Sequence, residues 1–281
     1  MFTSRLYNCR ILLTAALVKK GLALTPVKFG ISFTTSFLNQ AGALIHIYKD
    51  GSIHLNHGGT EMGQGLFMKV AQIVAEEFQV DVGRIKVSAA NTDKVPNTSA
   101  TAASSGTDLN GMAAKNAARK IKRRLANFAA REFDVPANEI QFLPNRVQAG
   151  NHILTFDELV LKAYLNRVQL SATGFYKTPK IHYNRERASG RPFFYFSYGA
   201  AVSEVAIDTL TGECRVLAVD IIHDVGKSIN PALDIGQIEG GFVQGLGWLT
   251  TEELYWNKQG HLMTHSPSVY KIPTCGDRPE I

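Results

Sequence analysis

A glycine-rich segment near residue 60 has the composition of a loop that lets a ligand approach the backbone. Residues 58–65 read Gly-Gly-Thr-Glu-Met-Gly-Gln-Gly, and apolar residues at helical spacing follow between Leu66 and Phe78. A helix N-terminus carries unpaired N–H groups and a partial positive charge, so such a loop can hold a phosphate or another anion. The spacing is neither the P-loop pattern nor the G-x-G-x-x-G fingerprint, which argues against ATP or NAD binding. A tight turn without a ligand is the plainer interpretation of one loop alone.

Two further loops lead into helices in the same way. Residues 91–107 are mostly small or hydroxyl-bearing and precede a long basic helix, and Asn230 and Pro231 form a capping pair before a third helix. A glycine costs roughly 0.5–1 kcal/mol relative to alanine inside a helix, so we expect another backbone or a cofactor to lie against the third helix. Convergence of the three junctions would hold a large polar cofactor. The glycines of the third helix are Gly236, Gly240, Gly241, Gly245 and Gly247.

The elements that must position these loops are strands and helices in mixed order. Alternating apolar and polar residues at 42–55, around Asp50 and Gly51, predict a β-hairpin. A short strand is expected at residues 85–89. Two β-rich runs, 193–207 and 214–223, are joined by a Thr-Gly turn, and the third helix follows through Leu249. Hairpins mixed with helices predict an α+β fold.

The charge pattern does not indicate a nucleic-acid partner. The 281 residues are 45% apolar and carry a formal net charge of +6, enough for a folded core and a soluble surface. The densest basic stretch, residues 115–131, places Lys115, Arg119 and Lys122 at helical spacing opposite apolar residues such as Ile121 and Leu125. This pattern favours a solvated helix face over a phosphate-backbone reader.

The cysteines fit a reducing, cytoplasmic setting, and the apolar N-terminal run resembles the h-region of a signal peptide only superficially. Cys9, Cys214 and Cys275 are too far apart to indicate a disulfide framework or an iron–sulfur motif. The apolar run at residues 11–18 is too short to span a bilayer, so we expect no membrane anchor and no export.

Two other kinds of catalytic site have weak support. His54 and His57 are three residues apart at the end of a strand and therefore face opposite sides, which disfavours a shared zinc ion. Ser104 and Ser105 lie in a small-residue loop without the G-x-S-x-G elbow, so a serine hydrolase remains only a distant alternative.

Eight short strings follow one another along the chain. They are Lys-Phe-Gly-Ile-Ser-Phe at 28–33, Phe-Leu-Asn-Gln-Ala-Gly at 37–42, Gly-Gly-Thr-Glu-Met-Gly-Gln-Gly at 58–65, Val-Pro-Asn-Thr-Ser at 95–99, Thr-Ala-Ala-Ser at 101–104, Thr-Gly-Phe-Tyr at 173–176, Asp-Ile-Gly-Gln at 234–237 and Tyr-Lys-Ile-Pro at 270–273. In this order they resemble the xanthine dehydrogenase and aldehyde oxidase family, in the C-terminal part of its molybdenum-cofactor-binding region. The resemblance covers residues 19 to 281, and the Thr-Gly-Phe-Tyr string favours xanthine dehydrogenase.

The resemblance implies a set of cofactor-binding and substrate-binding residues. Met62 and Gln64 would contact the pterin, Ala103 would lie beside the molybdenum, and Gln237 would hydrogen-bond the pterin from the third helix. Phe33 would stack on a flat heteroaromatic substrate, with Thr34 at its polar edge. Backbone N–H groups at Ser104, Ser105 and Gly106 would meet the cofactor's phosphate end, and Gly63, Thr101 and Ala102 complete the set. Serine is expected after Ser105 in some relatives, so only a backbone contact is implied at Gly106.

By the same resemblance, the activity would be hydroxylation of a purine-type heterocycle or an aldehyde at a molybdenum–molybdopterin cofactor. Electrons would pass to 2Fe-2S clusters, FAD and NAD held by other domains or subunits. The first half of the cofactor pocket and the Gly-Glu-Pro-Pro string that carries the general-base glutamate are expected outside this chain, so no catalytic residue is assigned within it. We therefore expect no hydroxylation by this polypeptide alone.

The resemblance also suggests a division of the chain. Residues 1–18 form a divergent segment, residues 19–165 a first α+β half of the molybdopterin-binding domain, and residues 166–281 a second α+β half that is truncated at its C-terminal end. A cofactor-binding module without turnover, an inert gene remnant and an aldehyde oxidase-type enzyme remain the alternatives.

Overall fold

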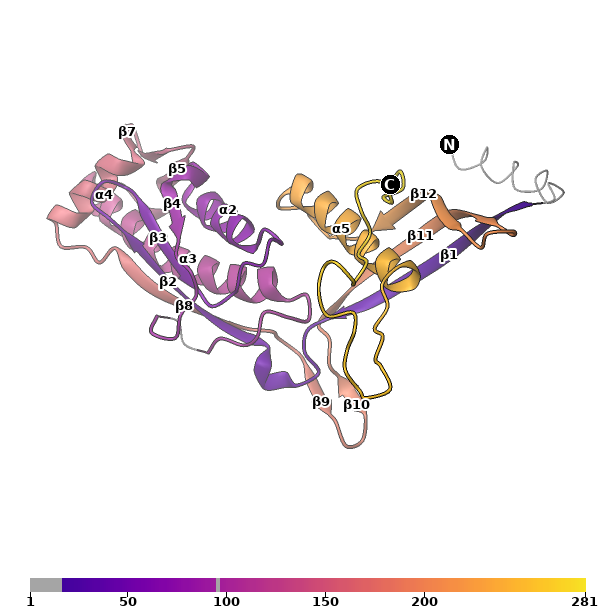
Figure 1. Ribbon diagram of the computed structural model, residues 1–281. Helices are drawn as coiled ribbons and strands as arrows, with labels where there is room; N and C mark the ends of the chain where they lie inside the picture. The colour runs from indigo at the N-terminus through magenta and orange to yellow at the C-terminus, as the bar shows by residue number, and fades with distance from the viewer. Residues whose placement is uncertain (1–16, 95–96) are drawn as a thin grey trace. The chain divides into compact units, whose positions relative to one another are not determined.

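The computed structural model describes residues 17–94 and 97–281, which form two compact units (Figure 1). The larger unit is Gly30–Phe196, and the smaller unit combines residues 17–29 with Ser197–Ile281. The boundary expected after residue 165 falls inside the larger unit, because strand β8 (Ser171–Lys177) pairs there with β2 (Gln40–Ile47). Most of the divergent segment 1–18 lies outside the described residues.

A four-stranded sheet forms the centre of the larger unit, with the order β4-β3-β2-β8. Strands β2 and β3 (Ile53–His57) form the antiparallel hairpin that the alternation predicted, and the short strand β4 (Ile85–Val87) runs parallel to β3. Helix α2 (Leu66–Phe78) follows the glycine-rich loop, and α3 (Gly106–Glu132) follows the small-residue loop. These elements and the mixture of strand directions confirm the α+β prediction.

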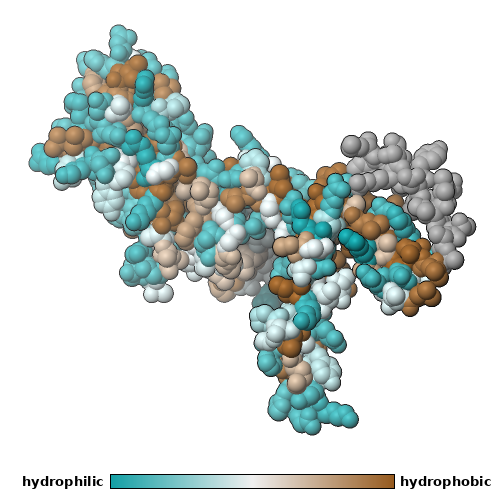
Figure 2. Space-filling model, turned by 45° about the horizontal axis from the view of Figure 1, so that its top comes forward, coloured by the Kyte–Doolittle hydropathy of each residue, from teal (hydrophilic) through white to brown (hydrophobic). Residues whose placement is uncertain are grey.

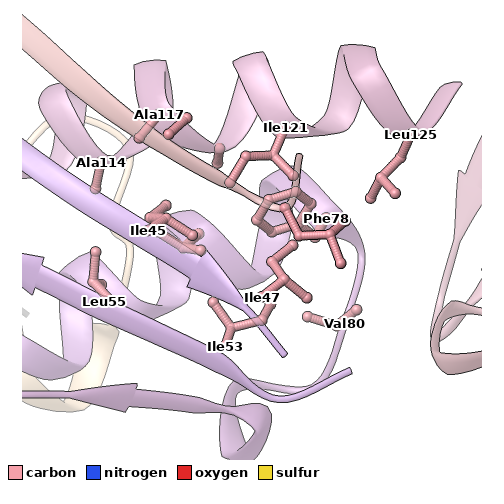
Figure 3. Close-up of a cluster of buried hydrophobic side chains, with 14 of the residues drawn as sticks. Ile45, Ile47, Ile53, Leu55, Phe78, Val80, Ala114, Ala117, Ile121 and Leu125 are labelled. Atoms are coloured by element: carbon pink, nitrogen blue, oxygen red, sulfur yellow. The ribbon is translucent and has the colours of Figure 1, made fainter. Parts of the chain in front are cut away.

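The hydrophobic core lies between this sheet and the two helices (Figure 3). Ile45 and Leu55 from the hairpin are fully buried, as are Phe78 from α2 and Ile121 and Leu125 from α3. Burial of such side chains contributes roughly 1.5–3 kcal/mol each. The core therefore fixes the starts of α2 and α3 relative to the strands that precede them.

Helix α3 lies unusually close to strand β8. Its contact face consists of alanines, and Ala113 and Ala117 are fully buried against the strand. A Cβ built on Gly174 of β8 would lie 1.9 Å from the Ala113 carbonyl oxygen and 2.6 Å from the Ala117 nitrogen. Small residues on both sides thus allow the two backbones to touch.

The sequence predicted that the basic residues of α3 form a solvated face, but two of its lysines bond to neighbouring elements. Lys120 Nζ donates to the Thr173 carbonyl oxygen at 2.8 Å, and Lys122 Nζ donates to the Glu77 carbonyl oxygen at 2.6 Å. These bonds tie the helix to β8 and to the C-terminal end of α2. The reason is geometric, because long cationic side chains reach the unpaired carbonyls of neighbouring elements.

The remaining elements of the larger unit are short. A meander of β5 (Ile140–Leu143), β6 (Arg146–Ala149) and β7 (His152–Thr155) leads into α4 (Phe156–Leu165), and β9 (His182–Asn184) pairs with β10 (Ser189–Arg191). Single turns of 3₁₀ helix occur at Ser36–Leu38, Val82–Arg84 and Ala137–Glu139.

The smaller unit consists of a three-stranded sheet and one helix. The sheet has the order β1-β11-β12, with β1 at Val18–Ile31, β11 at Tyr195–Asp208 and β12 at Cys214–His223, and helix α5 spans Pro231–Thr250. Large apolar side chains remain exposed here, including Trp248 and Leu249, and patches of hydrophobic residues lie on this unit's surface (Figure 2). No helix in the described part of the chain is long and apolar enough to cross a membrane.

Candidate functional site

The two predicted loops of the larger unit lie side by side. The Thr60 amide donates to the Thr101 Oγ1 at 2.9 Å, which joins the glycine-rich loop to the loop before α3. Met62 and Gly63 are exposed in the first loop, and Ala102 is exposed in the second. The hydrogen bond therefore brings together two of the three segments expected to meet at a cofactor.

The N-terminus of α2 is filled by a carboxylate of the chain itself. Glu61 accepts amide hydrogen bonds from Gly63 at 2.9 Å, Gly65 at 3.0 Å and Phe67 at 2.9 Å. Partial burial opposes ionisation of this carboxyl, but the amide donors outweigh it and lower the pKa of Glu61. Glu61 therefore already provides an anion at the N-terminus of α2. The expected contact of this loop with a cofactor stays a prediction.

Gln64 holds the first loop in shape. Its Oε1 accepts from the Met62 amide at 2.6 Å, and its Nε2 donates to the Thr60 carbonyl oxygen at 2.8 Å. A primary amide has a second N–H and a second lone pair, so Gln64 retains capacity for a ligand while it braces the loop.

The N-terminus of α3 has no side-chain cap. Ser105 is the N-cap residue, but its hydroxyl donates to the Ala102 carbonyl oxygen at 3.1 Å and accepts from no helix amide. Unpaired N–H groups at the start of a helix attract an anion. Of the helices that carry predicted cofactor residues, α3 therefore offers the open anion site.

The backbone before α3 is held in a strained conformation. Ala103 and Ser104 have φ values of 56° and 53°, in the left-handed region that non-glycine residues seldom adopt. Each such residue costs on the order of 1–3 kcal/mol, and residues of this kind cluster at functional sites. The strain falls at Ala103, the position expected beside the molybdenum.

The buried side chain of His57 supports the first loop through a hydrogen bond. His57 is fully buried, its Nδ1 accepts from the Gly59 amide at 3.1 Å, and its ring meets the Phe67 ring edge-on at 5.1 Å. Burial lowers the pKa of His57 to about 4, although Glu61 nearby opposes the shift. Since Nδ1 accepts a hydrogen bond, the ring proton is on Nε2, which has no partner among the described residues. His57 is therefore a neutral brace, a role that sequence spacing did not predict.

Asp108 in the first turn of α3 was also missed from the sequence. Burial raises the pKa of this carboxyl, and a hydrogen bond with Tyr195 opposes the shift. Burial, and then the charge of Asp108, raise the pKa of Tyr195 above its ordinary value. The Asp108 carboxyl thus interacts with the Tyr195 hydroxyl. It does not cap the helix, and the first-turn amides of α3 have no side-chain acceptor at the N-cap.

The predicted substrate residues lie in the turn before β2. Phe33 is half-buried and Thr34 is exposed. The Phe33 amide donates to Asn39 Oδ1 at 2.7 Å, and Asn39 Nδ2 donates back to the Phe33 carbonyl oxygen at 2.8 Å. This pair of bonds fixes the backbone at Phe33, and the stacking role of its half-buried side chain stays a prediction.

Gln237 belongs to the smaller unit, so its part in the site stays a prediction. It is exposed on α5, whose N-cap Asn230 accepts from the Leu233 amide at 3.2 Å as the sequence predicted. The sequence predicted another backbone or a cofactor against these glycines, and no described backbone lies near most of them. A Cβ added at Gly236, Gly240, Gly241 or Gly245 would meet no described atom within 4 Å, whereas one at Gly247 would meet Glu252 and Pro273.

Comparison with known sequences gives one consistent result. Residues 12–279 match a family described as the molybdopterin cofactor-binding domain. The chain is 51% identical over 261 residues to a xanthine dehydrogenase/oxidase of Felis catus and 50% identical over 268 residues to a xanthine dehydrogenase of Oryza sativa. These alignments cover 93% of this chain but 18% of each relative, so the chain spans about a fifth of the length of either relative.

Solved structures share the fold. Quinoline 2-oxidoreductase of Pseudomonas putida superposes with a TM-score of 0.82 and 23% identity, over 100% of this chain and 36% of that one. A CO dehydrogenase of Oligotropha carboxidovorans superposes with a TM-score of 0.79 and 24% identity, over 94% of this chain and 33% of that one. At these identities the likeness establishes the fold.

Proposed function

Because the chain belongs to the molybdopterin cofactor-binding domain family, we propose that it supplies part of the cofactor site of a xanthine dehydrogenase-type molybdenum hydroxylase. The observation that carries this proposal is the uncapped N-terminus of α3, which lies beside a second, glycine-rich loop. An anionic cofactor with a phosphate end and a flat pterin fits such a place.

The proposed donors are backbone amides and side chains of the two loops. The backbone N–H groups of Ser104 and Gly106 would hold the phosphate end, with Thr101 and Ala102 lining the approach. The Ser105 N–H donates to the Ala102 carbonyl oxygen at 3.4 Å and would share its hydrogen with the phosphate. Met62, Gly63 and Gln64 would lie against the pterin, and Gln237 would add a hydrogen bond. Ala103 would lie beside the molybdenum, where its small side chain leaves room for the metal and its ligands.

When bound, the cofactor supplies the redox chemistry, and this chain's residues bind and orient. The substrate we propose is a purine-type heterocycle, since the curated relatives named above are xanthine dehydrogenases. Phe33 would stack on its ring and Thr34 would fix its polar edge. We propose that iron–sulfur and flavin domains elsewhere in the full enzyme accept the electrons.

Cofactor binding can be tested with the chain by itself. The chain is incubated with free molybdenum cofactor, passed through a desalting column, and analysed for bound pterin by fluorescence after oxidation. We expect retention of about one pterin per chain. Retention no greater than that of the heat-unfolded chain would contradict the proposal.

The substrate class needs the completed enzyme. The full-length protein should turn over xanthine with an artificial electron acceptor, and its kcat/KM for xanthine should exceed that for an aromatic aldehyde. A preference for the aldehyde would leave cofactor binding intact and overturn the purine assignment.

A further inference from the structure

A depression on the larger unit is lined by three arginines and no acidic residue. Arg124 and Arg131 come from the C-terminal half of α3, and Arg167 follows the C-terminus of α4. Asn127 and Asn166 also line it. Guanidinium groups in one depression repel each other unless nearby negative charge compensates them.

Of the three arginines, Arg124 is the one that donates hydrogen bonds to other described residues. Arg124 Nη1 donates to the Ser171 carbonyl oxygen at 2.7 Å and to the Gln169 carbonyl oxygen at 3.3 Å, which fixes its guanidinium. The exposed side chains of Arg131 and Arg167 have no hydrogen-bond or ion-pair partner among the described residues. The neighbouring Glu132 is already paired with Lys162 at 3.3 Å.

The helix ends at this place do not balance the positive charge. Both α3 and α4 end at the depression, and a helix C-terminus carries roughly half a negative elementary charge, so the two ends contribute about one. Against three guanidinium groups this leaves a surplus of about two positive charges. A singly charged ligand would leave part of the surplus uncompensated, whereas a dianion would match it.

We propose that this depression binds a phosphoryl group. Arginine forks donate paired, parallel hydrogen bonds to phosphate oxygens, and Arg131 and Arg167 retain all their donors for this purpose. Arg124, held by two carbonyl oxygens, provides a fixed third cation, and the Asn127 amide adds a neutral donor. The ligand is a dianionic phosphate, either free or esterified to a larger molecule.

This site is separate from the proposed cofactor site. Arg131 and Gly106 lie near opposite ends of α3, which at 1.5 Å per residue places them roughly 35–40 Å apart. The inference does not rest on the proposed function, because the glycine-rich loop, the small-residue loop and the N-terminus of α3 contribute nothing to this depression.

The test is a calorimetric titration of the full 281-residue chain with inorganic phosphate, at an ionic strength held constant with chloride. Exposed arginines in water bind phosphate weakly, so we expect a Kd in the low millimolar range. The double variant Arg131→Gln/Arg167→Gln should weaken binding about tenfold or more. The matched control is Arg185→Gln/Arg187→Gln, which removes the same charge from the exposed turn between β9 and β10 and should bind like the wild type.

The comparison between the two double variants decides the outcome. Thermal unfolding confirms that both are folded, which is expected because the substituted side chains are exposed. Equal phosphate binding by the two variants would place the anion elsewhere and overturn the proposal. A parallel titration with adenosine 5′-monophosphate separates the sources: tighter binding than phosphate identifies an esterified phosphoryl group, equal binding identifies free phosphate, and binding of neither overturns the site.

Discussion

Among single residues, His57 gives the clearest link between burial and a measurable property. Its Nδ1 can accept from the Gly59 amide only while the ring is neutral, and burial lowers its pKa from an ordinary 6.5 to about 4. A lowered histidine pKa means that the unfolded chain binds the proton more tightly. The free energy of unfolding should therefore fall as the pH drops from 6.5 towards 4, by roughly 3 kcal/mol in all.

The measurement is chemical denaturation of the wild type and of His57→Gln at several pH values between 7 and 4. The variant should be less stable at pH 7 and should lack this part of the pH dependence. The exposed His182→Gln on β9 is the control and should follow the wild type. Parallel curves for the wild type and His57→Gln would show that another group causes the loss.

Phe33 separates a binding role from a packing role. Its side chain is half-buried, and its backbone is held by Asn39 whatever the side chain. In the completed enzyme, Phe33→Ala should raise the KM for a purine substrate about tenfold or more, since loss of a stacking contact costs on the order of 1–3 kcal/mol. The melting temperature should fall by only a few degrees, and a large fall with an unchanged KM would assign Phe33 to the core.

The residue types of the two loops could be recognised from the sequence, but several of their contacts could not. Glycines, hydroxyls and the order of the motifs pointed to residues 58–65 and 101–106. That Glu61 would fill the N-terminus of α2, and that His57 would be buried beneath the loop, depends on how the loop folds back on β3. Such contacts arise from tertiary packing and leave no periodic signal.

Among the elements, the close contact between α3 and β8 makes a strong prediction about Gly174. A methyl group at this position would overlap the backbone of α3, which cannot move without disturbing the core. Gly174→Ala should lower the free energy of unfolding by about 3 kcal/mol, the upper range for overpacking. Denaturant unfolding measures this loss.

Gly83→Ala is the matched control for the backbone contact. A Cβ at Gly83 would meet no described atom within 4 Å, and its φ is not in the left-handed region, so this change should alter the stability by less than about 1 kcal/mol. Similar losses of unfolding free energy in Gly174→Ala and Gly83→Ala would show that the backbones of α3 and β8 are not in contact at Gly174.

Elements with strong periodicity were predicted well, and those without it were missed. The 42–55 hairpin, helices α2, α3 and α5, and strands β11 and β12 are confirmed. Helix α4 was missed although its capping box, Thr155 with Glu158, is a recognisable T-x-x-E signal. Strand β1 was missed because its apolar and polar residues do not alternate, and most of its residues are exposed among the described parts of the chain.

At the scale of the whole molecule, most glycines of α5 lack a neighbouring backbone among the described residues, and the cofactor that the sequence offered as the other neighbour stays a prediction. The free-energy cost of five glycines inside a helix indicated a close neighbour. No described part of the chain lies within 4 Å of a Cβ built on four of these five glycines. Large apolar side chains on the same unit are also exposed. Since the chain spans about a fifth of each curated relative named above, we propose that other parts of the full enzyme cover these surfaces.

The central claim is that the N-terminus of α3 holds the phosphate end of a molybdenum cofactor, and a pair of variants at Ser104 tests it directly. Ser104 is exposed and has a positive φ, which both aspartate and asparagine tolerate. Ser104→Asp places a carboxylate where the cofactor's phosphate would bind, whereas Ser104→Asn has nearly the same shape and no charge. The carboxylate should also stabilise the free helix by roughly 0.3–1 kcal/mol.

The measurement is pterin retained after incubation with the cofactor and desalting, made on both variants at the same protein concentration. We predict that Ser104→Asp binds the cofactor about tenfold more weakly than Ser104→Asn, a difference of about 1.4 kcal/mol, while its melting temperature is equal or higher. Equal retention of pterin by the two variants would contradict the placement of the cofactor at the N-terminus of α3.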